Sequence, residues 1–495
     1  MHPVTIGGSR GGGKRSGRRE FVLRDYSRRM ATVDSTRDDA LGSDDVMELQ
    51  HRLRRRKVSA RELRDAARAR LATVNDQLNA VVRDLDVTPA VNGPFAGVPS
   101  ALKDNEDLTG YPTLHGSWAP ADTPATSTSP WIAQYLALGF EPVAKTTLPE
   151  FGLTASTESS RYGATRNPWD TTRSVGGSSG GSAALVAAGV VPIAHANDGG
   201  GSIRIPAAAC GLVGLKPSRG RLVDTPELDR LPINLVTQGV VTRTVRDTAY
   251  YFAEAERMHR SADLPPIGMV VRPESRRLRI GVFTEAIAGI PADPRVHDAV
   301  HATARTLEGL GHQVEEISAP VDEAFGRDFL RYWALISFLL QKAGGRVLGT
   351  EFDSSRTEPL TQELSRMARE QALSIPVSLR RLVRASREPE PVFASYDVVL
   401  SPVLSTPAPL IGELGPDVPP REHIVRLLRF ASFTAWQNVT GSPAISLPLA
   451  RTEEGLPIGV QIGAPLGEES RLISLGYELE EAMPWPRTPG QLAAE

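Results

Sequence analysis

The chain has 495 residues, of which 40% are hydrophobic and 23% are charged. These fractions are typical of globular proteins and exclude a disordered chain or a coiled coil. The 56 basic and 58 acidic residues give a net charge of −2, which excludes binding to nucleic acid or to acidic membranes through bulk charge.

The first residues differ in composition from the rest. Residues 1–30 contain eight basic residues and a Gly-rich run, with almost no apolar periodicity. We therefore expect a disordered basic tail over residues 1–40 and one domain over residues 41–495. Arg18-Arg19 resembles a twin-arginine export signal, but a polar stretch follows where an apolar segment is required. Met30 followed by Ala31 is typical of a start, which gives the hypothesis that residues 1–29 precede the natural start site.

Helical and extended patterns alternate along the rest of the chain. Ser59 to Glu62 forms a capping-box pattern, and apolar residues then recur at helical spacing up to Val74. Asp293-Pro294 predicts the start of another helix, which Gly311 ends. Short apolar runs predict strands at residues 142–145, 190–194, 278–283, 314–317, 396–403, 444–449 and 457–462. This alternation predicts an α/β fold, with one large sheet covered by helices on both faces.

Two Gly/Ser tracts, residues 176–182 and 198–202, are the candidate centre of the chemistry. A predicted helix at 183–188 follows the first tract, and the second opens just after the predicted strand that ends near Ala194. Consecutive glycines let backbone N–H groups converge without interference from Cβ atoms, which suits an oxyanion hole. Ser202 would then attack a carbonyl whose oxygen those amides bind. Composition alone favours the alternative that both tracts are ordinary loops.

Other interpretations of the glycines fit less well. A P-loop would end in Gly-Lys-Ser/Thr, and neither tract contains a lysine. A dinucleotide fingerprint would follow a strand, whereas a polar stretch precedes the first tract. Residues 177–181 match the G-x-S-x-G elbow, which would make Ser179 the nucleophile of an α/β-hydrolase-type esterase. That elbow requires an apolar strand before it, which is missing, and a later histidine, for which the chain offers His259, His297, His301, His312 and His423.

A nucleophilic Ser202 requires a base. His195 and His115 are candidates, although a lone histidine is more often structural than catalytic. Lys103 follows a largely apolar run, and burial would lower its ordinary pKa of about 10.4 toward neutrality. Without further information, a surface or ion-paired lysine is the alternative.

Three motifs together resemble the amidase signature family: Gly97 to Asn105, Gly176 to Ala184 and Asp198 to Pro206. The resemblance extends from about residue 45 to about residue 485. It includes spacings of 75 positions from Lys103 to Ser178 and 24 from Ser178 to Ser202, which are similar to those of the family's Ser-Ser-Lys triad. The resemblance implies one domain built on a twisted mixed sheet.

The resemblance also implies the roles of the site residues. Ser202 would be the nucleophile that forms an acyl-enzyme, Ser178 a bridging serine after a cis peptide bond, and Lys103 the base. The oxyanion hole would be formed by the amides of Ser202 and of three glycines, Gly199, Gly200 and Gly201. The activity implied is hydrolysis of a carboxamide to an acid and an amine or ammonia, without cofactor or metal. The partner would be a small-molecule amide, with no nucleic acid and no membrane, and a homodimer is left open.

The sequence departs from the common family pattern at Gly199, usually Thr, Ile or Ser, and at Asn197, usually Ser or Thr. The run 163–169, with His195 to Asp198, is similar to the branch that contains hydrolases of cyclic aminohexanoate oligomers. The amidase-like component of a tRNA-dependent amidotransferase is the alternative function, and a non-enzymatic binding module is disfavoured because all three triad residues are present.

Two further expectations concern location and substrate. Cys210 is the only cysteine, so an internal disulfide is excluded and a cytoplasmic location is expected. No run reaches the roughly 20 apolar residues of a membrane span. Residues 321–391 depart most from the family pattern and are expected either to shape the substrate pocket or to add core aromatics, with Tyr332, Trp333, Phe338 and Leu339 on one helix.

Overall fold

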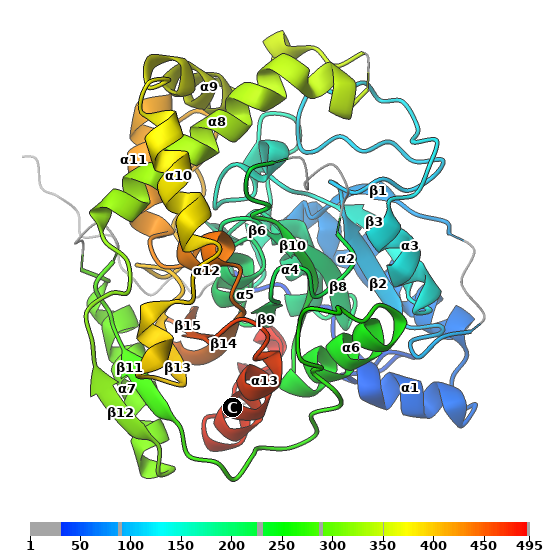
Figure 1. Cartoon of the computed structure of the whole chain (residues 1–495). Coiled ribbons are helices and arrows are strands. Elements are labelled where there is room, and N and C mark those ends of the chain that lie inside the picture. Colours follow the sequence, from blue (N-terminus) through cyan, green and yellow to red (C-terminus); the bar gives the residue numbers. More distant parts are fainter. Residues whose placement is uncertain (1–30, 88–91, 225–230, 287–290, 350, 493–495) are drawn as a thin grey trace, which may run out of the picture.

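A large mixed sheet forms the centre of the molecule in the computed structural model, which describes residues 31–87, 92–224, 231–286, 291–349 and 351–492 (Figure 1). Within these residues, eight strands pair in the order β12-β11-β13-β15-β14-β9-β10-β8. Strand β11 pairs in parallel with β12 and β13, and the other neighbours pair antiparallel. The eight strands are β8 (Ile193–Asp198), β9 (Val213–Lys216), β10 (Thr237–Thr242), β11 (Arg279–Val282), β12 (Gln313–Glu316), β13 (Val398–Pro402), β14 (Ala444–Arg451) and β15 (Pro457–Gly463).

A smaller sheet continues this surface beyond β8. Its strands are β1 (Val81–Asp84), β2 (Pro99–Lys103) and β3 (Glu141–Thr146), in the order β1-β3-β2. Strand β2 lies beside β8, since Ser100 Oγ donates to the carbonyl of Ile193 at 3.0 Å. Two short hairpins precede the first glycine tract: β4 (Glu158–Ser159) with β5 (Gly163–Ala164), and β6 (Arg166–Asn167) with β7 (Asp170–Ser174).

Helices cover both faces of the large sheet, as predicted. Helices α6 (Val245–Met258), α7 (Pro294–Gly309) and α13 (Glu469–Ala482) share one apolar cluster with the side chains of β11, β13, β14 and β15. Helix α5 (Arg204–Cys210) lies against the opposite face, because a Cβ placed on Gly459 would come within 2.3 Å of the Ala208 Cβ. The remaining helices of the body are α1 (Val46–Arg54), α2 (Ala60–Leu78), α3 (Pro130–Ala137), α4 (Gly180–Ala187), α12 (Ala435–Thr440) and α14 (Pro489–Leu492).

Four further helices form a separate layer, which we call the cap (Figure 1). They are α8 (Glu323–Val347), α9 (Pro359–Glu370), α10 (Ile375–Ala385) and α11 (Pro420–Phe430). Leu360 and Leu364 of α9 pack with Ala334 of α8 and Ile424 of α11, so the cap has a small apolar core of its own.

Most predicted elements are present, with shifted ends. The capping box at Ser59 begins α2, and Asp293 caps α7. The strand expected at 190–194 begins only at Ile193, because Gly189, with φ +74°, and the residues after it form a turn. The polar stretch before the first glycine tract is itself the short strand β7.

The segment 31–40, which we expected within the tail, packs against the body. The Val33 amide donates to the carbonyl of Pro168, and the Ser35 amide donates to that of Ala188. Buried Arg70 pairs with Asp39. The expected tail residues 1–30 lie outside the described residues. None of the helices in the described ranges is long and apolar enough to span a bilayer.

Candidate active site

Lys103 is buried at the end of β2, with 1% of its surface exposed. Its Nζ lies 2.7 Å from Ser178 Oγ, 3.0 Å from Ser179 Oγ and 2.7 Å from Asn197 Oδ1. The two serines directly precede α4, and the asparagine comes from β8. The peptide bond between Gly177 and Ser178 is cis, as the resemblance implied. The fold therefore joins three segments, distant in sequence, around one amine.

Burial makes this amine less basic. Removal from water lowers the pKa of Lys103 from 10.5 to about 7, against the opposing effect of the negative charges of Asp198 and Glu106. A substantial fraction of the lysine is therefore neutral near pH 7, as a proton acceptor must be.

The hydrogen bonds orient the neutral amine. The Ser179 hydroxyl donates its proton to the backbone carbonyl of Asn197 at 3.3 Å. Ser179 Oγ is therefore the acceptor in its contact with Lys103 Nζ. Asn197 Oδ1 can only accept. A neutral amine has two N–H donors and one lone pair, so both donors are used by these two oxygens. The lone pair then remains for the hydroxyl proton of Ser178.

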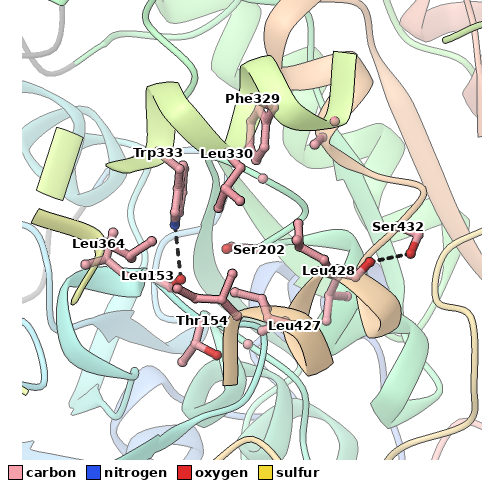
Figure 2. A pocket seen from close by; sticks show the side chains of 18 of the residues that line it. Leu153, Thr154, Ser202, Phe329, Leu330, Trp333, Leu364, Leu427, Leu428 and Ser432 are labelled. Carbon is pink, nitrogen blue, oxygen red and sulfur yellow. Dashed lines mark hydrogen bonds between the residues drawn. The ribbon is translucent and has the colours of Figure 1, made fainter. Parts of the chain in front are cut away.

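Ser202 lies in the loop between β8 and α5 and lines a cavity (Figure 2). Gly177 and Gly200 line the same cavity. The loop is held by Asp198 and Arg204, whose side chains are completely buried and joined by two hydrogen bonds of 2.9 and 3.0 Å. This ion pair holds the pKa of Asp198 well below its usual range, despite the opposing effect of burial. The Ser202 loop is thus fixed by a buried charge pair.

One predicted oxyanion donor differs from expectation. The Gly201 N–H donates to Asp198 Oδ1 at 2.6 Å, so in this arrangement it does not serve the cavity. The amides of Gly200 and Ser202 have no acceptor among the described residues, and both residues line the cavity. A Cβ on Gly199 would be 3.8 Å from Trp333 Cη2, so α8 covers this loop.

Of the alternative site residues, His195 and Ser179 are completely buried and His115 is half-buried. His195 Nδ1 accepts from the Lys103 amide at 3.2 Å, its Nε2 lies 3.1 Å from Gln238 Oε1, and burial lowers its pKa to about 3. His115 has φ +50°, and burial lowers its pKa to about 4. Ser179 is completely buried and does not line the cavity.

The cavity has a volume of about 380 Å³ and lies between the Ser202 loop and the cap. Figure 2 shows Phe329, Leu330 and Trp333 of α8 above Ser202, with Leu427 and Leu428 of α11 at one side. Trp333 Nε1 donates to the Leu153 carbonyl at 3.1 Å, which ties α8 to the loop beside Ser178. Of the four residues predicted on this helix, Trp333 lines the cavity. Tyr332 instead is buried against the Ile233 carbonyl, and Leu339 is exposed.

Sequence reasoning missed the contribution of Asn197 and of α11. In the sequence, Asn197 stands out only as a departure from the family pattern, and a polar residue at a strand end beside the second glycine tract was the available signal. Residues 420–430 have apolar residues at helical spacing, but such a stripe does not distinguish a cavity wall from a core contact.

Comparisons with known proteins agree with this architecture. The family model Amidase matches residues 53–473. The putative amidase AmiC of Mycobacterium tuberculosis (strain ATCC 25618 / H37Rv) is 44% identical over 475 residues, which cover 94% of this chain and 100% of that protein. A component of the glutamyl-tRNA(Gln) amidotransferase of Pseudomonas syringae pv. syringae (strain B728a) is 32% identical over 482 residues, which cover 89% of this chain and 97% of that one.

Among solved structures, that of 6-aminohexanoate cyclic dimer hydrolase complexed with substrate superposes with a TM-score of 0.79 and 31% identity, covering 90% of this chain and 98% of that one. The fold and the site thus define an α/β domain of the amidase signature architecture. The chain belongs to the Amidase family. The α/β-hydrolase alternative with Ser179 as nucleophile is therefore not retained.

Proposed function

We propose that the chain hydrolyses a carboxamide to a carboxylic acid and an amine or ammonia, through an acyl-enzyme on Ser202. The observation that carries this proposal is the buried amine of Lys103, whose lone pair is left for Ser178 by its contacts with Ser179 and Asn197. Membership of the Amidase family supports it.

In the proposed mechanism, protons pass between the three side chains of the triad. Lys103 accepts the proton of Ser178, and Ser178 accepts that of Ser202 as the Ser202 oxygen attacks the amide carbon. The amides of Gly200 and Ser202 stabilise the oxygen that becomes negative. The same chain of groups then returns a proton to the leaving nitrogen, and water hydrolyses the acyl-enzyme with the steps repeated.

Gly201 has a different role in this mechanism. Because its N–H binds Asp198, it shapes the loop instead of contacting the oxyanion. Gly199 remains a proposed donor. A Cβ on Gly199 would meet Val236 Cγ2 at 3.2 Å, so the glycine fits the loop closely against Val236.

The experiment combines activity with active-site labelling. The purified chain should release ammonia or amine from simple amides, and a fluorophosphonate probe should label Ser202. A Ser179→Ala variant should still be labelled, whereas Ser202→Ala should not. Labelling of Ser179 in place of Ser202 would contradict the mechanism.

A role within a tRNA-dependent amidotransferase is the second candidate, favoured by the 32% identity to the amidotransferase component. The chain would then act with partner proteins and charged tRNA. The apolar wall beside Ser202 argues against a small charged amide such as glutamine, because its ammonium and carboxylate would find no counter-ion there; the charged lining residues, Glu323 and Arg327, pair with each other at the exposed end. Amide hydrolysis by the isolated chain would support the amidase, and activity only with a partner protein and tRNA would support the alternative. A cytoplasmic location remains part of the proposal.

A further inference from the structure

The wall of the cavity facing Ser202 is built from apolar side chains of the cap and of several segments of the body. Helix α8 contributes three aromatic side chains, of which Phe329 and Trp333 stack with ring centroids 5.6 Å apart and planes at 23°. The other apolar side chains of the wall come from α8 itself, from the loop after β3, from α5, from α9, from α11 and the residue after it, and from the start of α12: Phe325, Leu330, Leu153, Ala155, Ile205, Leu364, Ile424, Leu427, Leu428, Ala431 and Ala435.

The polar side chains of this wall already have partners within the protein. Trp333 Nε1 donates to the Leu153 carbonyl, and Thr154 Oγ1 lies 3.0 Å from His423 Nε2. The Ser432 hydroxyl is within hydrogen-bond distance of two carbonyls of the preceding turn, including that of Leu428 (Figure 2). Near Ser202, the polar side chains of the described lining, Thr154, Trp333 and Ser432, are thus each hydrogen-bonded within the protein.

Charge is found only at the outer end of the lining that the structure describes. Glu323 and Arg327 are one helical turn apart on α8, pair with each other at 3.4 Å, and are 69% and 61% exposed. His423, behind Thr154, has a pKa lowered by burial to about 4, so it is neutral at pH 7 and adds no positive charge. An ionic group placed deep in the cavity would lose water and gain no counter-ion.

We propose that the substrate is an uncharged amide that carries a bulky apolar group, aliphatic or aromatic, against Phe329, Leu330 and Leu427. This inference rests on the proposed amidase function and adds the substrate class. The cavity volume of about 380 Å³ lies at the lower end of the range of about 300–1,000 Å³ that small-molecule sites have, enough for a chain of about eight carbons or a phenyl ring with its linker.

Two substrate series test the class. Primary amides from acetamide to octanamide place the apolar group on the acyl side, and N-alkylacetamides from methyl to hexyl place it on the amine side. In at least one series kcat/KM should rise about fourfold for each CH₂ that the wall buries. The kcat/KM of heptanamide should be at least about 100-fold higher than that of 6-aminohexanamide, in which an ammonium replaces the terminal methyl. It should exceed the kcat/KM of adipamic acid, which ends in a carboxylate, by a similar factor.

A charge placed in the wall provides a second test. Leu330→Glu should lower kcat/KM for octanamide at least about tenfold and favour the ammonium-ended amide. The matched control, Leu339→Glu, changes an exposed leucine of the same helix and should leave both values unchanged. If Leu330→Glu does not fold, as checked by circular dichroism and Tm, the wild-type series alone decides.

The outcomes separate this inference from the proposed function. Hydrolysis that does not increase along either series, or charged amides cleaved as fast as heptanamide, would overturn the substrate class and leave the amidase function standing. If Ser202 is labelled by the probe but no member of either series is hydrolysed, the substrate class is likewise overturned. If no amide is cleaved and Ser202 is not labelled, the proposed function itself fails.

Discussion

The pKa of Lys103 gives a quantitative prediction for the pH dependence of acylation. With a folded-state pKa of about 7, about half of the molecules carry a neutral Lys103 at pH 7 and about 1% do so at pH 5. An unperturbed lysine would be neutral in only about 0.03% of molecules at pH 7. The acylation rate should therefore rise about tenfold per pH unit up to about pH 7 and level off above about pH 8.

Single-turnover measurements with a chromogenic amide, followed from about pH 5 to about pH 10, report this rate separately from deacylation. The same profile for Ser179→Ala serves as a comparison, since that change removes one contact of the amine and keeps the triad. A rate that is flat from about pH 5 to about pH 9, or one that rises only near pH 10, would refute a neutral lysine as the base.

The same pKa must appear in the stability of the protein. The value is about 7 in the folded chain and near 10.5 in the unfolded chain, so between these pH values the unfolded state binds one more proton. The burial of protonated Lys103 destabilises the folded chain. This cost is fully present below pH 7 and disappears as the pH rises to 10.5. The free energy of unfolding of the wild type, relative to Lys103→Met, should therefore increase by about 1.4 kcal/mol per pH unit across this window. Urea unfolding at about pH 7, 8 and 9 measures it, and a constant difference would contradict the burial of a titrating lysine.

Three other predictions concern neighbouring residues. Ser202→Ala should lower the acylation rate, measured by single turnover, by at least about 1,000-fold. Ser179→Ala is the matched variant. A smaller loss in Ser202→Ala would point to another nucleophile. Asn197→Leu removes an acceptor of the lysine amine and should reduce the acylation rate about tenfold. Asn197→Thr keeps an oxygen and should retain most of the wild-type acylation rate. Equal losses in the two variants would argue that Asn197 has only a packing role. Arg204→Met leaves the buried Asp198 carboxylate without its cation and should lower the free energy of unfolding by about 3–5 kcal/mol in urea titrations; a change under about 1 kcal/mol would show that the pair is not needed.

Much of the fold followed from local sequence patterns. The capping box at Ser59 and the Asp293-Pro294 start identified α2 and α7, because these signals satisfy backbone groups within a single turn. The pairing order of the strands could not be predicted from local patterns. Strand β14, for example, pairs with β9, which is distant in the sequence, and no local signal indicates such a partner. Residues 31–40 were expected to be disordered because their polar composition gave no sign of the carbonyl groups of Pro168 and Ala188 that they bind.

The site shows the same division. Spacing and family resemblance brought Lys103, Ser178 and Ser202 into the hypothesis, and the structure brings Lys103 and Ser178 within 2.7 Å. The use of the Gly201 amide by Asp198 was not predictable, because a glycine tract indicates that amides can converge and does not indicate which of them a neighbouring carboxylate takes. Only the arrangement of the side chains distinguishes these donors.

The two parts of the cavity differ in how strongly the chemistry constrains them. The triad side is fixed by buried groups that would be costly to leave unpaired, such as Asp198 with Arg204 and Lys103 with its three oxygens. The cap side contacts the substrate through apolar packing, which tolerates exchanges of similar volume. Substrate preference should therefore change through α8 and α11 while the triad and its partners stay the same. Trp333 is the exception in the cap, because its N–H holds the loop beside Ser178. Exchange of this tryptophan should thus affect both kcat and substrate preference, whereas exchange of Leu427 should affect preference alone.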